Sequence, residues 1–396
     1  MNYPGFILAN AFRNKRRTTL TILSLAASVF LLATLEGLLN YMVTHAEETG
    51  SVNRIIVRRK TSLADRLPES YIDKVAQLEG IDSVTPMVWF GGIYKEFKPE
   101  NFFGQLSCDP ETFQRVVSEA KVVDPATGKP SPELYEEFKK DRAGAIAGWE
   151  LCKQHGWKLG ERITLQGMIY PINLELTLRA AYHAEKGGTD NQTLYYHHKY
   201  IDELLGRPGL IGIVSARVKN SDDIPRLIEK IDGMFANSDF ETLTETEQAF
   251  QLGFVKMMGN LSMLVRSIGM AIAFTMLMVA ANTTAMAARE RAQEIGVMKA
   301  IGFVPGSVLT ILMIEATIVA LIGASLGAGI AYFGSPIIEE GMQHSPMAFF
   351  FAEYTMKPWI PAAAIIVGAA VGIVSSFFPC WRVVRLPIST SLRRLA

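Results

Sequence analysis

The sequence predicts a membrane α-helical protein with four transmembrane helices and a large α+β domain inserted between helices 1 and 2. Hydrophobic residues make up 49% of the 396 positions, and they concentrate in four blocks with hardly a charge. The stretch 43–250, between the first two blocks, instead shows the strand and helix patterns of a soluble domain. Formal net charge is zero, from 39 basic and 39 acidic residues, which gives no reason to expect nucleic acid as a partner.

Each of the four apolar blocks is near the length of about 20 residues that a helix needs to cross a hydrocarbon core. A buried helix of a soluble protein would explain any one block, but not four together. The first block could be a signal peptide, since Lys15, Arg16 and Arg17 precede it. However, the run is long for a signal peptide, and no convincing cleavage site follows it. We therefore expect four uncleaved spans, within segments 20–42, 251–288, 307–333 and 359–378.

Basic residues indicate the orientation of these spans. They cluster before the first span, between the second and third, and after the fourth, whereas the external loop 334–358 is mainly acidic. The positive-inside rule then places both termini and the loop 289–306 in the cytoplasm. The sequence thus predicts a multi-pass protein of the bacterial inner (cytoplasmic) membrane, with the 43–250 domain periplasmic. An amphipathic segment, 1–19, is expected at the inner membrane surface, and 379–396 is expected to be a cytoplasmic tail.

Within the extracytoplasmic domain, a strand is expected at 53–59, a helix at 68–80 and a second strand at 81–90. A similar unit returns late in the domain, with a strand at 210–219 and a helix at 222–235. Short strands lie between the two units, so the pattern predicts two α+β lobes with a β-rich insertion. The segment from 246 to 266 is helical and less apolar, which predicts a stalk that continues into the second span.

The most unusual segment is "AMAARERAQEIGVMKAIGF", residues 285–303, a dense mixed-charge stretch between two apolar runs. Arg291 and Glu294 are three residues apart and therefore share a helical face. Ile295, Met298 and Gly302 follow at helical spacing, which predicts a short amphipathic helix that ends near the glycine. Because such a helix is fixed to a span at each end, it is suited to act as a mechanical link.

The sequence contains no G-x-x-x-x-G-K-[ST], H-E-x-x-H or C-x-x-C pattern, and its glycine-rich stretch "GASLGAG" (323–329), which includes one G-x-S-x-G, lies inside the third span. We therefore expect no catalytic residue and no metal site, and an energy source outside this chain. Four spans are also few for enclosing a substrate path, which favours a dimer. The adjacent His197 and His198 point in different directions on any regular element, so they do not indicate a shared metal ion.

Four stretches of the chain resemble the MacB/FtsX/LolC-LolE superfamily of ABC transporter permeases (type VII transporters). They are "RERAQEIGVMKAIGF", "LANAFRNKRRTTLTILSL", "FPCWRVVRLPISTSLRRL" and "IAGWELCKQHGWKLGERITLQG", and the similarity extends over essentially the whole chain. The resemblance implies a MacB-like periplasmic core domain and a coupling helix that docks into an ATPase. This chain begins almost at the membrane, so the split form, with the ATPase as a separate chain, is expected. The implied coupling residues are Arg289, Glu290, Arg291, Glu294, Ile295, Gly296, Met298, Lys299 and Gly302.

The resemblance also implies a function: a non-catalytic permease subunit that works by mechanotransmission, driving export or extraction of a hydrophobic or lipid-like cargo. Expected partners are two copies of an ABC ATPase that binds ATP and Mg²⁺, a second permease copy, membrane lipids, and an adaptor or outer-membrane component. No cofactor is expected in this chain. Two alternatives remain open at this point. One is an FtsX-like regulator of a cell-wall enzyme, and the other is half of a lipoprotein-releasing heterodimer.

Polar and small residues inside the spans are the last candidates. Glu315 lies within the third span, where an ionisable group faces protein or water, and Asn282 and Thr283, with the adjacent Thr284, are at comparable depth and could hydrogen-bond it. Small-x-x-x-small pairs allow close helix packing, either within one subunit or at a dimer seam. The resemblance favours packing within one subunit for these pairs, which are Gly323 with Gly327 and Gly368 with Gly372. Cys108 and Cys152 could pair in an oxidising compartment, although the sequence gives little reason to expect it.

Overall fold

The computed structural model describes residues 13–49, 51–98, 101–184, 191–257, 261–343 and 354–387. The chain divides into two compact units, a helical membrane unit and an α+β domain that lies between the first and second spans in the sequence. We call the second unit the outer domain. Most of the predicted amphipathic segment 1–19, and the end of the tail from residue 388, lie outside the described residues.

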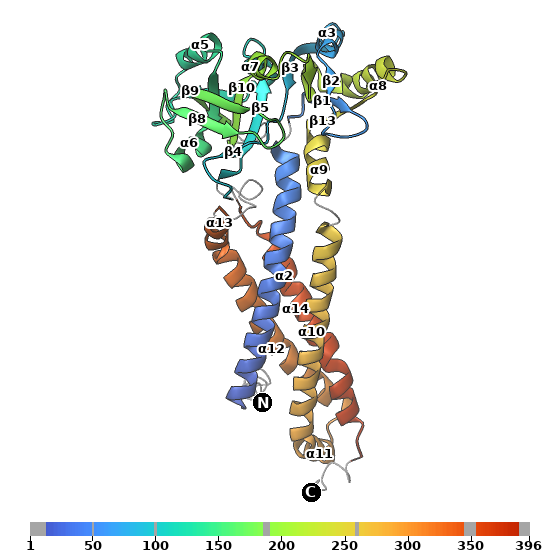
Figure 1. Ribbon diagram of the computed structural model, residues 1–396. Coiled ribbons are helices and arrows are strands. Elements are labelled where there is room, and N and C mark those ends of the chain that lie inside the picture. Colours follow the sequence, from blue (N-terminus) through green and yellow to red (C-terminus); the bar gives the residue numbers. More distant parts are fainter. Residues whose placement is uncertain are drawn as a thin grey trace. The chain divides into compact units, whose positions relative to one another are not determined.

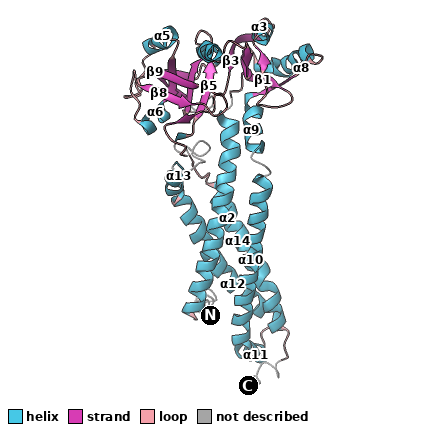
Figure 2. Ribbon diagram, in the orientation of Figure 1, coloured by secondary structure: helices cyan, strands magenta, loops and turns pink. Residues whose placement is uncertain are grey.

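Four helices of the described chain are long and apolar enough to cross a membrane. They are α2 (Lys15–Thr49), α10 (Leu261–Glu290), α12 (Pro305–Phe333) and α14 (Trp359–Val384). Each exceeds the roughly 20 residues that a span requires. Two shorter helices complete this unit: α11 (Ala292–Ala300) and α13 (Ser335–Gln343). The predicted fold class, four membrane helices with an inserted α+β domain, is confirmed (Figures 1 and 2).

Glycines set the spacing of the membrane helices. In α12, Gly323 and Gly327 lie directly against the backbone of α2 at Ile22 and Ala26. In α14, Gly368 and Gly372 face alanines of α12. Helix α14 also packs against α10, so it is central to the bundle. All four glycines therefore lie at helix contacts within one chain, where the lack of a side chain allows close approach.

One lobe of the outer domain is built from both ends of its sequence. Its sheet has the antiparallel order β13-β1-β12-β3, and helices α3 and α8 belong to the same lobe. This β-α-β-β-α-β arrangement is the split βαβ, or ferredoxin-like, motif. The elements are β1 (Arg54–Arg59), α3 (Ser70–Ala76), β3 (Ile81–Met87), β12 (Ile213–Val218), the 3₁₀ turn η2 (Ser221–Asp223), α8 (Ile224–Phe235) and β13 (Thr242–Thr246). A two-stranded ribbon joins β2 (Leu67–Pro68) to β11 (Leu210–Ile211).

The second lobe contains a mixed sheet in the order β4-β8-β9-β7-β10-β5, with β6 also paired to β9. Its strands are β4 (Ile93–Tyr94), β5 (Gly104–Cys108), β6 (Ala120–Val123), β7 (Gly144–Gly148), β8 (Arg162–Gln166), β9 (Asn173–Ala184) and β10 (Thr193–His197). Its helices are α4 (Phe113–Val116), α5 (Glu133–Lys140), α6 (Trp149–His155) and α7 (His198–Leu204). Aromatic and aliphatic side chains fill the core of this lobe, with Trp157 and Tyr196 almost fully buried.

The prediction of two α+β lobes separated by an insertion is wrong in one respect. The early unit and the late unit do not form separate lobes, because β1 pairs with β12 in a single sheet. The expected insertion is itself the second lobe. The predicted stalk corresponds to α9 (Glu247–Met257) and the start of α10, while residues 258–260, on which its continuity depends, lie outside the described residues.

Candidate functional site: the charged link between the second and third spans

The segment 289–302, called the link below, contains the last two residues of α10 and the short helix α11. Helix α10 ends at Glu290, Arg291 caps the next helix with non-helical angles, and α11 then runs to Ala300. Gly302 has a φ of 104°, and its N–H bonds to the Lys299 carbonyl while that of Phe303 bonds to the Met298 carbonyl. This bonding pattern is a Schellman motif, in which glycine takes a left-handed conformation that other residues adopt at a cost.

One face of the link is buried in the membrane unit. Ile295 is 1% exposed and packs in a cluster with Val308 of α12 and Cys380 of α14. Gly296, next to Ile295, is also buried, and Met298 and Phe303 pack at the edge of the same cluster. The link is therefore fixed to the ends of the spans by apolar contacts.

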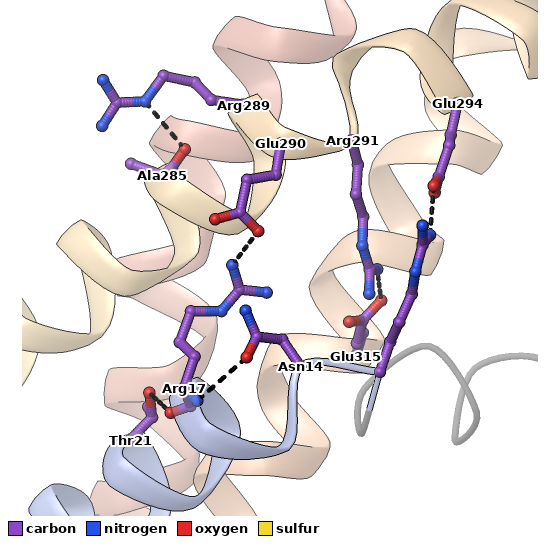
Figure 3. A network of polar contacts seen from close by, with 10 residues as sticks. Asn14, Arg17, Thr21, Ala285, Arg289, Glu290, Arg291, Glu294 and Glu315 are labelled. Atoms are coloured by element: carbon purple, nitrogen blue, oxygen red, sulfur yellow. Dashed lines mark hydrogen bonds and ion pairs between the residues drawn. The ribbon is translucent and has the colours of Figure 1, made fainter.

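An ion pair also joins the buried face of the link to the third span. The Arg291 guanidinium donates to the Glu315 carboxylate at 2.5 Å, and these side chains are only 10% and 14% exposed. Figure 3 shows the two side chains pointing toward each other from the two helices. Such a pair relieves the cost of placing a carboxylate in a membrane span. Glu315 is thus a contact of the link.

The sequence-based prediction had assigned different partners to Glu315. The sequence offers Asn282, Thr283 and Thr284 as residues that could hydrogen-bond it, but the Thr283 hydroxyl donates to the Val279 carbonyl at 2.8 Å in its own helix. Thr283 and Thr284 line the same small cavity as Arg291 and Glu315, without being the ion-pair partner. The expectation is corrected because a guanidinium provides the compensating charge that an amide or hydroxyl lacks.

Lys299 fixes the other end of the link to the fourth span. Its ammonium donates to the carbonyls of Val384 and Leu386, at 3.0 and 2.6 Å. These carbonyls lie at the end of α14, where the helix leaves backbone acceptors unsatisfied and where positive charge is favourable. Through Arg291 and Lys299, the link is therefore tied to α12 and α14, as well as being continuous with α10.

The opposite face of the link is exposed and partly apolar. Val297, Ile301 and Val304 are 47%, 73% and 66% exposed and follow one another at intervals of four and three residues. That spacing places them on one side of a helix and its exit. Gln293 and Glu294 are also exposed and begin the same row. The row forms an apolar ridge with a carboxylate at one end.

Acidic residues of the link reach arginines at the start of α2. Glu290 pairs with Arg17 at 2.5 Å (Figure 3). Glu294 pairs with Arg13. The carboxylates of Glu290 and Glu294 are 45% and 46% exposed, so both pairs are screened by water and contribute little stability. The buried pair at Glu315 has no such exposure to water.

Beside the link lies an open groove of about 500 Å³. Arg13 and Glu294 line it, with Val297 and Met298 on the link side and Ile311 and Leu312 on α12. The groove is mainly apolar with charged groups among its lining residues, which is the character of a protein-binding surface.

The structure divides the residues that the resemblance implies for coupling. Arg289, Glu290 and Glu294 are exposed, and Arg289 donates to the Ala285 carbonyl of its own helix. The others with a side chain, Arg291, Ile295, Met298 and Lys299, contact the spans. Sequence reasoning missed Val297, Ile301 and Val304, which their common spacing on one helical face could have indicated.

The remaining candidates in the outer domain are structural. Cys108 and Cys152 are free, buried thiols that belong to different core clusters. His197 bonds to the Phe138 carbonyl and His198 contacts the Ser107 hydroxyl, and burial lowers the pKa of both imidazoles. Within the described residues, no group of three or more His, Cys, Asp or Glu side chains is placed to hold a metal ion.

These features define a multi-pass membrane protein with a large inserted domain and a two-faced link. Residues 266–388 match the model of the FtsX-like permease C-terminal family. The uncharacterized ABC transporter permease MJ1507 of Methanocaldococcus jannaschii is 23% identical over 97% of this chain and 96% of its own length. The chain is thus similar to ABC transporter permeases, with an FtsX-like permease domain matched over residues 266–388.

Two further comparisons involve MacB proteins. The macrolide export ATP-binding/permease protein MacB of Escherichia coli is 25% identical over 48% of this chain, and the match spans only 28% of that protein. Among solved structures, the periplasmic region of MacB from Actinobacillus actinomycetemcomitans aligns with 52% of this chain and 94% of its own. That alignment has 12% identity and a TM-score of 0.37.

Proposed function

We propose that this chain is the non-catalytic membrane subunit of an ABC transporter and that the exposed face of the link is its docking surface for a separate ATPase. The division of the link into two faces is the observation that carries the proposal. The inner face is bound to the spans through Arg291, Ile295 and Lys299. The outer face contains Glu294 and the apolar ridge, whose side chains are much more exposed than those of the inner face.

This arrangement is suited to transmit force. A partner that binds Val297 and Ile301 and moves would displace a short helix that directly follows α10 in the chain and is tied to α12 and α14. Closely packed helices move as units, because a packed interface resists continuous deformation. ATP and Mg²⁺ would be bound by the partner, and the movement would reach the outer domain through the spans.

The rest of the proposal concerns orientation, assembly and cargo. The basic residues around the link support a cytoplasmic location for it and for both termini, with the outer domain on the periplasmic side of a bacterial inner membrane. Two copies of the chain with two ATPases would form the transporter, with an adaptor as a further partner. Mechanotransmission would then drive export or extraction of a hydrophobic or lipid-like cargo, since four spans are few for a wide pore.

Charge reversal at the docking face tests the proposal. Glu294→Arg is expected to weaken association with the ATPase at least about tenfold, because it places a cation beside the apolar ridge and repels basic groups that face Glu294. The measurement is the amount of ABC ATPase that co-purifies with the tagged full-length protein from native membranes. Insertion and abundance should be unchanged, since Glu294 is 46% exposed and its ion pair with Arg13 is exposed to water.

Glu340→Arg is the matched control, because Glu340 is an exposed carboxylate in α13, after the far end of α12. It should leave ATPase association unchanged. Equal loss of the ATPase in both variants would mean a general charge effect, and normal association of Glu294→Arg with coupled ATP hydrolysis would rule out the docking assignment.

A further inference from the structure

A buried arginine in the outer domain joins three parts of that domain that are far apart in the sequence. Arg54, at the start of β1, has a side chain that is 1% exposed. Its guanidinium donates to the Val116 carbonyl at 2.9 Å and to the Glu119 carboxylate at 2.6 Å. It also donates to Glu247, the first residue of α9, at 2.8 Å. One side chain therefore connects the first lobe, the second lobe and α9.

Glu247 receives a second hydrogen bond, from the Ser51 backbone N–H at 2.7 Å. Burial raises the pKa of this carboxyl group, because desolvation disfavours its charged form. A buried ion pair contributes little net stability for this reason, and its value lies in fixing one arrangement of the groups it joins. The contacts of Glu247 fix the start of α9 against the first residues of the outer domain.

A second arginine holds the same turn of the second lobe. Arg217 of β12 is the direct cross-strand neighbour of Arg54. It donates to the Ser118 hydroxyl and to the Arg115 carbonyl. Two like charges on opposing strands are unfavourable unless they have separate partners. Here the guanidinium groups of both arginines donate hydrogen bonds to the turn formed by residues 115–119.

Arg58, on the same strand, provides the contrast. Its guanidinium pairs with Glu245 of β13 at 2.7 Å, and both side chains are about as buried as Glu119. However, β1 and β13 are neighbours in one sheet. The Arg58 pair therefore stays within the first lobe, whereas Arg54 connects the first lobe to the second lobe and to α9.

We infer that Arg54, with Arg217, is a positioning residue that locks the 115–119 turn of the second lobe and the start of α9 into one rigid body. Because α9 lies three undescribed residues before α10, this body is the part of the outer domain through which movement of the second span would enter. The locking itself is independent of the proposed function, and only the last step, the transmission of movement, rests on it.

The test measures a distance within the outer domain of the full-length protein in lipid nanodiscs. Spin labels are attached to cysteines introduced at the exposed positions Ala249 in α9 and Lys140 in α5 of the second lobe. The native cysteines are buried, so labelling is confined to the introduced ones. Without nucleotide, the parent protein should give one narrow distance peak. In Glu119→Ala the narrow peak should be replaced by a broader distribution of distances between the labels. In the double variant Ser118→Ala/Glu119→Ala that distribution should be broader still.

Glu245→Ala is the matched control, since it removes an equally buried arginine partner inside one lobe. It should keep the narrow peak. Arg54→Met is avoided as the main variant because it would leave Glu247 buried without its cation. An unchanged narrow peak in Ser118→Ala/Glu119→Ala, with a folded protein, would overturn the inference.

A second arm separates this inference from the proposed function. With the ATPase and ATP present, the distance between the two labels in the parent protein should stay constant, because α9 and the second lobe move together. A change in that distance on ATP addition would overturn the locking while supporting the proposed function. If the ATPase does not bind the protein at all, the proposed function fails, and the measurements without nucleotide still decide the locking.

Discussion

Gly327→Ala is expected to destabilise the membrane helix bundle by about 1–3 kcal/mol, the usual cost of overpacking a close contact. A Cβ atom at this position would lie 3.0 Å from the Ala26 Cα, and closer still to the Ala26 carbonyl group of α2. Because those atoms are backbone, they cannot move aside as a side chain can, so the two helices must separate. The measurement is the apparent melting temperature of the purified full-length protein in detergent.

Gly329→Ala is the control, and it should act in the opposite direction. It lies two residues further along α12, and among the described residues no heavy atom lies within 4 Å of an added Cβ. In an open helix, replacing glycine with alanine stabilises by about 0.5–1 kcal/mol, because the unfolded chain loses freedom. Equal melting temperatures for the two variants would contradict the contact between α2 and α12.

The membrane fold was predictable because its signals are local. About 20 consecutive apolar residues indicate a span. A glycine that follows a helical pattern indicates the end of the helix, as at Gly302. The positions of the spans and the existence of a short helix in the link therefore agree with the structure. The close packing at Gly323 and Gly327 was anticipated by their spacing, but the sequence does not say which helix they face.

Contacts between distant residues could not be predicted from one sequence. Glu119 and Glu247 lie 65 and 193 positions from Arg54 in the sequence, and no local pattern connects the three residues. For the same reason, the sequence did not show that the two predicted lobes form a single lobe. Several strands have compatible patterns, and the pairing of β1 with β12 depends on the tertiary structure. The apolar ridge at Val297 and Ile301 was missed because exposed and buried apolar residues are identical in sequence.

The ion pair between Arg291 and Glu315 is expected to give the second large effect, and a double-mutant cycle measures it. Arg291→Leu or Glu315→Leu alone should destabilise the protein by about 3–5 kcal/mol, because each leaves one buried charge without its partner. The double variant should recover most of that loss, since two apolar side chains replace two charges. Melting temperatures of the four proteins in the cycle provide the measurement.

Arg289→Leu is the control for the cycle, because Arg289 is exposed and donates to a carbonyl of its own helix. It should change the free energy of unfolding by less than about 0.5 kcal/mol. A parallel cycle on Arg13 and Glu294 should give a coupling of at most about 1 kcal/mol, since that pair is exposed to water. Equal couplings in the two cycles would mean that Glu315 is hydrated and not bound to Arg291. A large coupling in the Arg291–Glu315 cycle alone would identify Glu315 as an anchor of the link. A carboxylate held by Arg291 in this way is not available to bind cargo.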